Sequence, residues 1–451
     1  MDVLPVDLDR LLTKLQEALE QNDLDRASEL IRSLRSPDQA ELFEGLDDHQ
    51  RIALLPKLAP AQSADILEEL EDSDALELFA ALLDEDAVRI IGEMEPDELA
   101  DLIGAAKPEV ARAILTKLED PEEIHPLLLH PNDSAGGLMT SEFLALRRRM
   151  TATDALRAIH AWKPDSEALH YLYVVDAVGV LQGMVSLRQL IVAEADSPLV
   201  EIMDPDVISV VTGTDQEEVA RLMTRYDLVN LPVVDSDARL LGVITIDDIV
   251  DVLEEEATED IQRFGGALPL DQPYLRTSVL SATRKRIGWL LLLFLTESLT
   301  GTVLRHFEHE LQSVVALAFF VPLLIGTGGN AGSQTTSTLI RALAVGDIDM
   351  SDALRAWWHE MRVGLLLGVG MGVVAYTRAL LWGTSALLAL TVALTLSTLV
   401  VWANGLGSIL PLIAARLGID PTVVSGPVMS TLVDATGLFI YFSIARSVLG
   451  I

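Results

Sequence analysis

The sequence predicts a multidomain protein with an all-α superhelical N-domain, a tandem α/β pair, a connecting acidic helix and an α-helical membrane domain of five spans. Three observations lead to this prediction. Residues 276–451 contain 11 Lys and Arg against 9 Asp and Glu, whereas the first 275 residues contain the other 21 against 59. Five long apolar runs follow one another in the C-terminal part. Before them, two stretches of sequence repeat one another at an offset of 59 residues.

Short amphipathic segments punctuated by Asp, Pro or Gly occupy residues 8–130. Examples that begin about every 10 to 13 residues are 61–70, 74–83, 86–94, 96–105 and 108–118. Such a period is typical of a stack in which each helix buries its apolar side on its neighbours. We therefore expect a small helical stack whose opposite faces carry Asp and Glu.

The acidic excess excludes some classes of partner and favours another. A net charge of −36 repels nucleic acid and anionic lipid headgroups. It attracts divalent cations, although an acidic surface also serves solubility alone. The chain contains no Cys, which excludes disulfides, thiolate metal sites and cysteine nucleophiles.

Residues 138–195 and 202–254 form the internal repeat. Val174, Val175 and Asp176 correspond to residues 233–235, and residues 183–186 correspond to residues 242–245. Each copy predicts a helix, a short apolar strand that ends in Asp, a turn, a second strand and a final helix. The pattern resembles a tandem pair of CBS domains, a regulatory and non-catalytic module.

In CBS domains, a Ser or Thr before a helix and an Asp three residues further on can hold the ribose of an adenosine nucleotide. Thr245 and Asp248 match this pattern, whereas Ser186 is followed by Gln189. Leu228 stands where the family's site has an aromatic residue. These departures count against ATP binding. The residues that the resemblance implies as ATP contacts are Tyr171, Arg188 and Thr245.

After the second copy, acidic side chains line one face of a predicted helix. They recur at helical spacing, at Asp248, Asp251, Glu255 and Glu259, with Glu254, Glu256 and Asp260 beside them. Like charges at this spacing destabilise a helix by about 0.2–0.5 kcal/mol per pair, and bound cations would relieve the repulsion. Because the helix leads to the first apolar run, it is placed to pass a cation signal to the membrane domain.

Five runs are long and apolar enough to span a bilayer, which takes about 20 residues. They are residues 287–304, 314–340, 363–381, 386–414 and 423–449. With a cytosolic N-terminus, seven of the Lys and Arg residues near the span ends lie inside and three outside, as the positive-inside rule requires. The chain opens without a secretory signal. We expect a multi-pass protein of the inner (plasma) membrane, with the N-terminus in the cytosol and the C-terminus outside.

Polar residues inside the spans indicate where an ion would pass, because lipid offers them no partners. Asp434 lies near the middle of the fifth run, with no Lys or Arg within a turn or two. Residues 326–334 contain four glycines and predict a helix break that exposes carbonyls, although small residues also serve close helix packing. A second break is expected where Asn404 precedes Pro411. The role of Glu297 in the first run stays open.

The whole chain resembles the MgtE-type magnesium channel family, through residues 322–334, 258–261 and 430–437. The resemblance implies a homodimer in which the second and fifth spans line the ion path and Asp434 selects Mg²⁺. Gly328, Gly329 and Asn330 would lie along that path. The implied domains are an N-domain at 1–131, CBS units at 132–199 and 200–254, a connecting helix and linker at 248–275, and a pore domain at 276–451.

Members of this family close when cytosolic Mg²⁺ bridges the N-domain, the CBS domain and the connecting helix. The resemblance implies sensing carboxylates from each of these parts, together with one at the cytosolic mouth of the fifth span. They are Asp65, Asp97, Asp101, Glu217, Asp227, Asp248, Asp251, Glu255, Glu259, Asp260 and Asp420.

The expected function is passive Mg²⁺ uptake through a dimeric, Mg²⁺-gated channel without enzymatic activity. Two alternatives stay open: a carrier that couples the divalent ion to Na⁺ or H⁺, and a divalent-cation sensor without transport. In a coupled carrier, Asp434 would serve a proton relay. The spans contain no HExxH motif, Ser/His constellation or paired catalytic Asp, which argues against an intramembrane enzyme.

Overall fold

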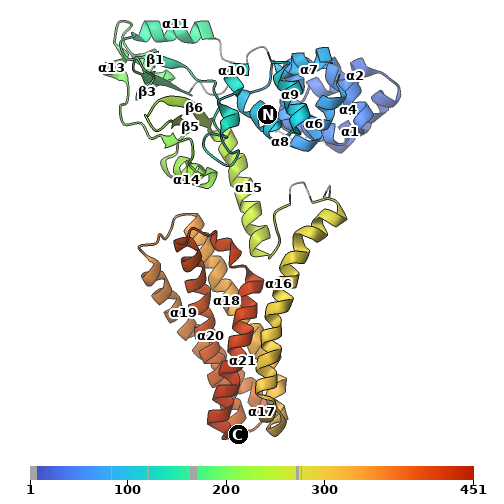
Figure 1. The fold of residues 1–451 in the computed structure, drawn as a ribbon, viewed down its shortest axis with the longest axis vertical. Helices are drawn as coiled ribbons and strands as arrows, with labels where there is room; N and C mark the ends of the chain where they lie inside the picture. Colours follow the sequence, from blue (N-terminus) through green and yellow to red (C-terminus); the bar gives the residue numbers. More distant parts are fainter. Residues whose placement is uncertain (1–7, 83, 119–120, 163–169, 271–273, 276) are drawn as a thin grey trace. The chain divides into compact units, whose positions relative to one another are not determined.

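The computed structural model describes residues 8–82, 84–118, 121–162, 170–270, 274–275 and 277–451. Residues 271–273 of the expected linker and residue 83 of the expected segment 74–83 lie outside the described residues. The chain forms two compact units, Met1–Leu253 and Glu254–Ile451. Figure 1 shows the helical and sheet elements of the first unit and the long helices of the second.

Short helices in succession build the N-terminal part of the first unit, as the periodicity predicted. Four of them, α5, α8, α9 and α10, begin with Pro at the first helical position, where the missing N–H costs nothing and the fixed φ suits the helix. The helices are α1 (Leu8–Glu20), α2 (Leu24–Arg32), α3 (Ser36–Glu44), α4 (Asp48–Leu54), η1 (Leu55–Lys57), α5 (Pro60–Glu68), α6 (Asp72–Ala81), α7 (Asp84–Ile91), α8 (Pro96–Ala105), α9 (Pro108–Leu115), α10 (Pro121–Ile124) and η2 (Leu127–Leu129).

Two three-stranded sheets follow, one for each copy of the repeat. Their strands are β1 (Ala145–Arg147), β2 (Tyr171–Val175) and β3 (Leu181–Ser186), then β4 (Val210–Val211), β5 (Asn230–Val234) and β6 (Leu240–Thr245). In each sheet the first strand pairs parallel with the second, and the second pairs antiparallel with the third. Helices α11 (Ala152–Trp162), α12 (Leu187–Val192), α13 (Leu199–Ile202) and α14 (Gln216–Tyr226) complete the two copies.

The two hairpins of the repeat use the same turn. The Asp176 carboxylate accepts hydrogen bonds from the backbone N–H groups of Val178 and Val180. Asp235, at an offset of 59 residues, accepts them from the N–H groups of residues 237 and 239. An Asp that bonds the backbone a few residues onward stabilises a tight turn locally, so the shared Asp residues explain why both hairpins close in the same register.

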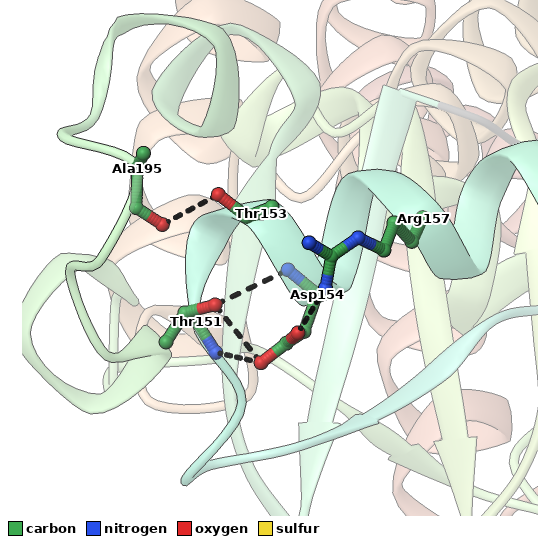
Figure 2. A network of polar contacts seen from close by, with 5 residues as sticks. All are labelled: Thr151, Thr153, Asp154, Arg157 and Ala195. Carbon is green, nitrogen blue, oxygen red and sulfur yellow. Dashed lines mark hydrogen bonds and ion pairs between the residues drawn. The ribbon is translucent and has the colours of Figure 1, made fainter.

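A reciprocal hydrogen-bond network begins helix α11 in the first copy (Figure 2). Thr151 donates its N–H and its hydroxyl to the Asp154 carboxylate, at 3.2 and 2.9 Å, and the Thr151 hydroxyl accepts from the Asp154 N–H at 3.2 Å. Arg157 pairs with the other Asp154 oxygen at 3.0 Å, and the Thr153 hydroxyl donates to the Ala195 carbonyl. The network satisfies backbone groups that the first helical turn leaves unpaired.

The expected acidic helix is α15 (Ile246–Phe264). Its first turns bury Ile249 and Val252 in the same hydrophobic core that holds the N-terminal helices and the second sheet. A separate, smaller core lies inside the first copy of the repeat. The second copy therefore shares its interior with the N-terminal helices, whereas the first copy contributes its opening residues, Leu138 and Met139, to that core.

Five helices are long and apolar enough to cross a membrane, which confirms the predicted fold class. They are α16 (Val279–His306), α18 (Val321–Ala344), α19 (Ala353–Leu381), α20 (Ala386–Arg416) and α21 (Gly426–Leu449), joined in part by α17 (Glu308–Ser313), η4 (Val315–Phe320) and η5 (Pro421–Val423). Each exceeds the roughly 20 residues that a bilayer requires.

The helix break expected at residues 326–334 was wrong, because α18 runs through them without interruption. Its glycines serve close packing instead. A Cβ on Gly328 would lie 2.9 Å from both Leu399 and Val433, and one on Gly332 would lie 2.7 Å from Met429. Neighbouring helices thus occupy the space that a side chain would need, which is the alternative that small residues allow.

The break expected at Asn404 was also wrong, since α20 continues from Ala386 to Arg416 with Pro411 inside it. In this helix too, a glycine permits contact: a Cβ on Gly407 would lie 2.6 Å from the carbonyl oxygen of Gly332 in α18. The Thr336 hydroxyl donates to the Gly407 carbonyl at 3.1 Å. Packing and a hydrogen bond between helices keep the backbone helical where composition alone predicted a break.

Candidate ion path and cation-sensing sites

Asp434 lies midway along α21, half-buried, and its Oδ1 atom is buried without a hydrogen-bond partner. Glu297 in α16 is exposed and is close enough to act on Asp434 electrostatically. The salt bridges of the described residues give Asp434 no cationic partner. An ionised carboxylate at membrane depth requires a proton, a metal ion or a partner, and a second carboxylate nearby strengthens that requirement.

The three residues expected beside the path lie on two different faces of α18. Gly328 and Gly329 are buried, and a Cβ on Gly329 would lie 2.9 Å from the hydroxyl of Ser430 in α21, one turn before Asp434. Asn330 is exposed, as is Gln334 one turn further on. The glycines therefore allow α18 and α21 to approach closely, whereas the Asn330 amide lies on an exposed face of α18.

The buried carboxylate of the first unit is Asp97 on α8, which is 6% exposed. Its Oδ1 atom has no hydrogen-bond partner. Burial, together with the charges of Asp248 and Glu95, raises the pKa of Asp97 well above its ordinary value. Burial also raises the pKa of Asp248 to about 6, although Thr245 donates its N–H and hydroxyl to that carboxylate. The fold thus places carboxyl groups of α8 and of the start of α15 close to one another, although their charges repel.

Three glutamates that the sequence analysis did not single out belong to the same cluster. Burial and the charges of Asp97 and Asp248 raise the pKa of Glu98 to about 9. Burial also raises the pKa values of Glu68 and Glu95, each to about 7. The Glu95 N–H donates to the Glu68 carboxylate at 2.8 Å. We define the acidic cluster as Glu68, Glu95, Asp97, Glu98 and Asp248.

Other expected sensing residues lie around this cluster or apart from it. Asp65 and Asp251 act electrostatically on Glu69, and Asp101 acts on Asp97. Glu217 and Asp227 stand at opposite ends of α14, about 15 Å apart along a helix axis, so the chain does not bring these two together.

The acidic cluster is not arranged as a finished metal site. Among the described residues, no group of three or more His, Cys, Asp or Glu side chains is placed to hold a metal ion directly. Burial first, and neighbouring carboxylates second, raise the pKa values of the cluster and favour its protonated forms. A divalent cation entering the cluster would replace protons and bring these oxygens together.

A second group of expected residues meets at the far end of α15. Arg263 pairs with both Glu259 and Asp420, and the Asp420 carboxylate also accepts from the Thr422 N–H at 2.8 Å. Burial and the charge of Asp420 raise the pKa of Asp260. Glu255, by contrast, is exposed on α15. The sequence analysis missed Arg263, which supplies a positive charge where only carboxylates were expected.

The residues expected to contact ATP come from both copies of the repeat. The Thr245 hydroxyl donates a hydrogen bond to the Asp248 carboxylate. In the first copy, Ser186 and Gln189 close a capping box on each other, which explains the departure from Asp at that position. Tyr171 is partly buried in β2, and Arg188 is exposed on α12.

Known proteins match this chain along most of its length. A family model described as a divalent cation transporter matches residues 321–444. A model of the MgtE intracellular N domain matches residues 34–133, and the CBS domain model matches 135–196 and 199–255. The magnesium transporter MgtE of Thermus thermophilus is 46% identical over 338 residues, 74% of this chain and 75% of that protein. The Bacillus subtilis protein of the same name is 35% identical over 74% of each chain.

Two solved structures resemble the soluble part. The crystal structure of the cytosolic domain of the Mg²⁺ channel MgtE in complex with ATP has 39% identity and a TM-score of 0.51, and covers 53% of this chain and 99% of that one. The soluble part of a magnesium transporter has 32% identity and a TM-score of 0.51, and covers 56% and 100%. Both agree with the multidomain fold described above.

Proposed function

This chain belongs to the MgtE family of divalent cation transporters, and from that premise we propose that it forms a Mg²⁺-selective channel that cytosolic Mg²⁺ closes. As a member of the family it is a membrane transporter and not an enzyme. The finer statements, which concern the ion path, gating, dimer and orientation, are our proposals.

The observation that carries the proposal is the unpaired oxygen of Asp434. Mg²⁺ gives up its water slowly and is bound by few carboxylates, often with several waters retained. An acceptor-only carboxylate inside the bilayer, beside the packed glycines of α18, suits a hydrated ion that passes and is not trapped. Two copies of Asp434 across a dimer axis would face one ion, and Asn330 would hydrogen-bond its water from the exposed side of α18.

Closure follows from the carboxylates of the soluble part. Without Mg²⁺, the carboxyl groups of the acidic cluster either keep protons or repel one another, and the repulsion favours separation of the elements that carry them. Bound Mg²⁺ would neutralise those charges and favour the packed arrangement, and a ligand shifts such an equilibrium only by its differential affinity for the two states. We propose that the carboxylates near the acidic cluster supply this response: Asp65, Asp97, Asp101, Asp248 and Asp251. Further carboxylates would contribute to it: Glu217, Asp227, Glu255, Glu259, Asp260 and Asp420.

Three further proposals complete the assignment. The protein is a homodimer, its N-terminus is in the cytosol, and its C-terminus lies outside, as an odd number of spans requires. ATP is a regulatory ligand of the CBS pair, a proposal that the ATP complex of a related cytosolic domain supports. Its contacts are Tyr171, Arg188 and Thr245.

The test is ion flux in liposomes that contain the full-length protein and a Mg²⁺-sensitive dye. We expect Mg²⁺ entry driven by the membrane potential alone, blocked when Mg²⁺ is raised on the side of the soluble part, and little affected by excess Ca²⁺. Single-channel recording separates a channel from a carrier, because a carrier saturates at a far lower turnover. Flux that requires a Na⁺ or proton gradient would establish the coupled carrier instead.

A further inference from the structure

A group of polar side chains, separate from Asp434, lies between α18, α19 and α20. Glu360 in α19 accepts hydrogen bonds from the Thr335 hydroxyl at 3.3 Å and from the Asn404 amide nitrogen at 3.4 Å. Thr335 and Asn404 are 5% and 1% exposed. Charge-assisted hydrogen bonds are usually about 2.7–2.9 Å long, so these two bonds do little to stabilise an ionised carboxylate.

The arginines nearest in sequence make contacts elsewhere. The Arg362 Nε donates to the Trp358 carbonyl at 3.3 Å, and Arg355 faces Asp352 at 3.9 Å. Among the salt bridges of the described residues, none includes Glu360. Glu360 is partly buried in the second turn of α19, and a carboxylate there without a cationic partner favours a bound proton or a small cation.

The amide of Asn404 favours a small cation over a proton. Its Oδ1 atom is buried and has no hydrogen-bond partner, and burying such an acceptor costs free energy unless something donates to it or binds it. Its backbone is held by the Ser408 hydroxyl, which donates to the Asn404 carbonyl at 2.8 Å. Gly364 makes room for the side chain, since a Cβ there would lie 2.9 Å from the Asn404 Cβ.

We propose that the Glu360 carboxylate, the Asn404 Oδ1 and the Thr335 hydroxyl form a sodium-binding site inside each protomer. One negative charge with neutral oxygens suits a monovalent cation. Mg²⁺ keeps several waters and demands octahedral geometry, which this closely packed place between helices does not provide. A bound Na⁺ joins α18, α19 and α20, and the site is separate from Asp434, so this inference does not depend on the proposed channel function.

The test is the apparent unfolding midpoint of the full-length protein in detergent, in sodium chloride and in equal concentrations of potassium or N-methyl-D-glucamine chloride. We expect Na⁺ to raise the midpoint by about 2 °C or more, with saturation, because a ligand that binds only the folded state stabilises it. Glu360→Gln and Asn404→Leu should abolish the Na⁺-specific shift. Thr391→Val is the matched control, since its hydroxyl bonds only within α20, and it should keep the shift.

A second measurement requires no variant. Trp357 Nε1 lies 4.0 Å from the Cβ position of Gly405, next to Asn404, so Na⁺ titration of the unaltered protein should change tryptophan emission with a saturating curve. Equal responses to Na⁺, K⁺ and N-methyl-D-glucamine in both assays would overturn the proposal. So would a response to pH alone, which would assign a proton to Glu360, or a Na⁺ shift that survives in Glu360→Gln.

Discussion

Arg263 near the end of α15 is hydrogen-bonded to Asp420, which precedes α21. The same guanidinium pairs with Glu259 one turn earlier in α15. This pair joins the acidic helix to the N-terminal end of the fifth span. Under the proposed gating, Arg263 lies where a divalent cation would bind between the two carboxylates, so Arg263 and Mg²⁺ would compete for Glu259 and Asp420.

Arg263→Gln should make the channel close at lower Mg²⁺. Removing the internal cation leaves Glu259 and Asp420 free to bind Mg²⁺, and the pair is partly exposed, at 40% and 33%. Pairs of this kind are worth about 0.2–1 kcal/mol, so we expect the closing midpoint to fall by a factor of about 1.4 to 5. Patch recordings over a Mg²⁺ series measure it. Arg305→Gln, in the last turn of α16, is the control. An unchanged closing midpoint in Arg263→Gln would reject the competition.

Asp434→Asn should reduce Mg²⁺ flux by more than about tenfold while the protein stays folded. The amide has nearly the same shape, so packing is kept, but the negative charge that favours a cation at membrane depth is lost. Dye-reported flux in liposomes measures the effect, with Asp347→Asn in the exposed segment after α18 as the control. Normal Mg²⁺ flux through Asp434→Asn would remove this residue from the ion path.

The acidic cluster predicts that Mg²⁺ closes the channel more readily as pH rises. Burial, together with the charges of neighbouring carboxylates, raises the pKa of Glu95 to about 7 and that of Glu98 to about 9, above the ordinary glutamate value of 4.5. A folded-state pKa that is raised favours the protonated form, so the stability from these groups is fully present below pH 4.5 and is lost as pH rises towards 9. Mg²⁺ must displace the retained protons, and its apparent affinity should rise up to about tenfold per pH unit for each proton released.

Protection of the full-length protein from a protease, titrated with Mg²⁺ at pH 6, 7 and 8, measures this effect. Glu98→Gln should flatten the pH dependence, whereas Glu29→Gln, on the exposed side of α2, should leave it unchanged. A Mg²⁺ midpoint that does not change with pH would show that the cluster binds no ion.

Thr151→Ala should lower the free energy of unfolding of the first repeat by about 1 kcal/mol, the usual cost of losing a helix cap. The hydroxyl both donates to Asp154 and accepts from its N–H, as Figure 2 shows. Arg157→Ala serves as the control, because its side chain is 74% exposed and such pairs contribute little. Thermal unfolding that is equally affected by both substitutions would contradict the capping role.

Gly407→Ala should disrupt the membrane domain, because the added methyl group would lie 2.6 Å from the Gly332 carbonyl oxygen. Overpacking of this kind typically costs about 1–3 kcal/mol. Gly370→Ala in α19 is the matched control, since its Cβ would meet no atom within 4 Å. Size-exclusion profiles and unfolding midpoints in detergent compare the two variants, and equal behaviour would argue against tight contact of α18 with α20.

Hydropathy and repeat spacing predicted the helical stack, the paired sheets and the five spanning helices, since these patterns report burial along each element. They failed at Gly328 and Asn404, because whether a glycine or an amide breaks a helix depends on which neighbour packs against it. They also missed Glu98 and Arg263. Neither residue stands out within its own helix, and only the packing of α8 and α15 on other elements gives them their neighbours.

The polar group around Glu360 also depends on contacts between residues that are far apart in the sequence. Glu360 and Asn404 are 44 residues apart. Glu360 lies near the start of α19 and Asn404 inside α20, and neither stands out in the sequence as part of a site. The sequence analysis considered Asn404 only as part of a helix break, and it did not consider Glu360 at all. Tertiary contact was needed to show that the amide oxygen lacks a partner.

The hairpin turns at Asp176 and Asp235 are closed by the same pair of backbone hydrogen bonds, yet the helices that follow the two hairpins differ. One has 6 residues and the other has 19. Because the shared turns keep the two sheets alike, the difference in helix length makes the halves of the repeat unequal, and the second half continues into a helix that extends beyond its own module.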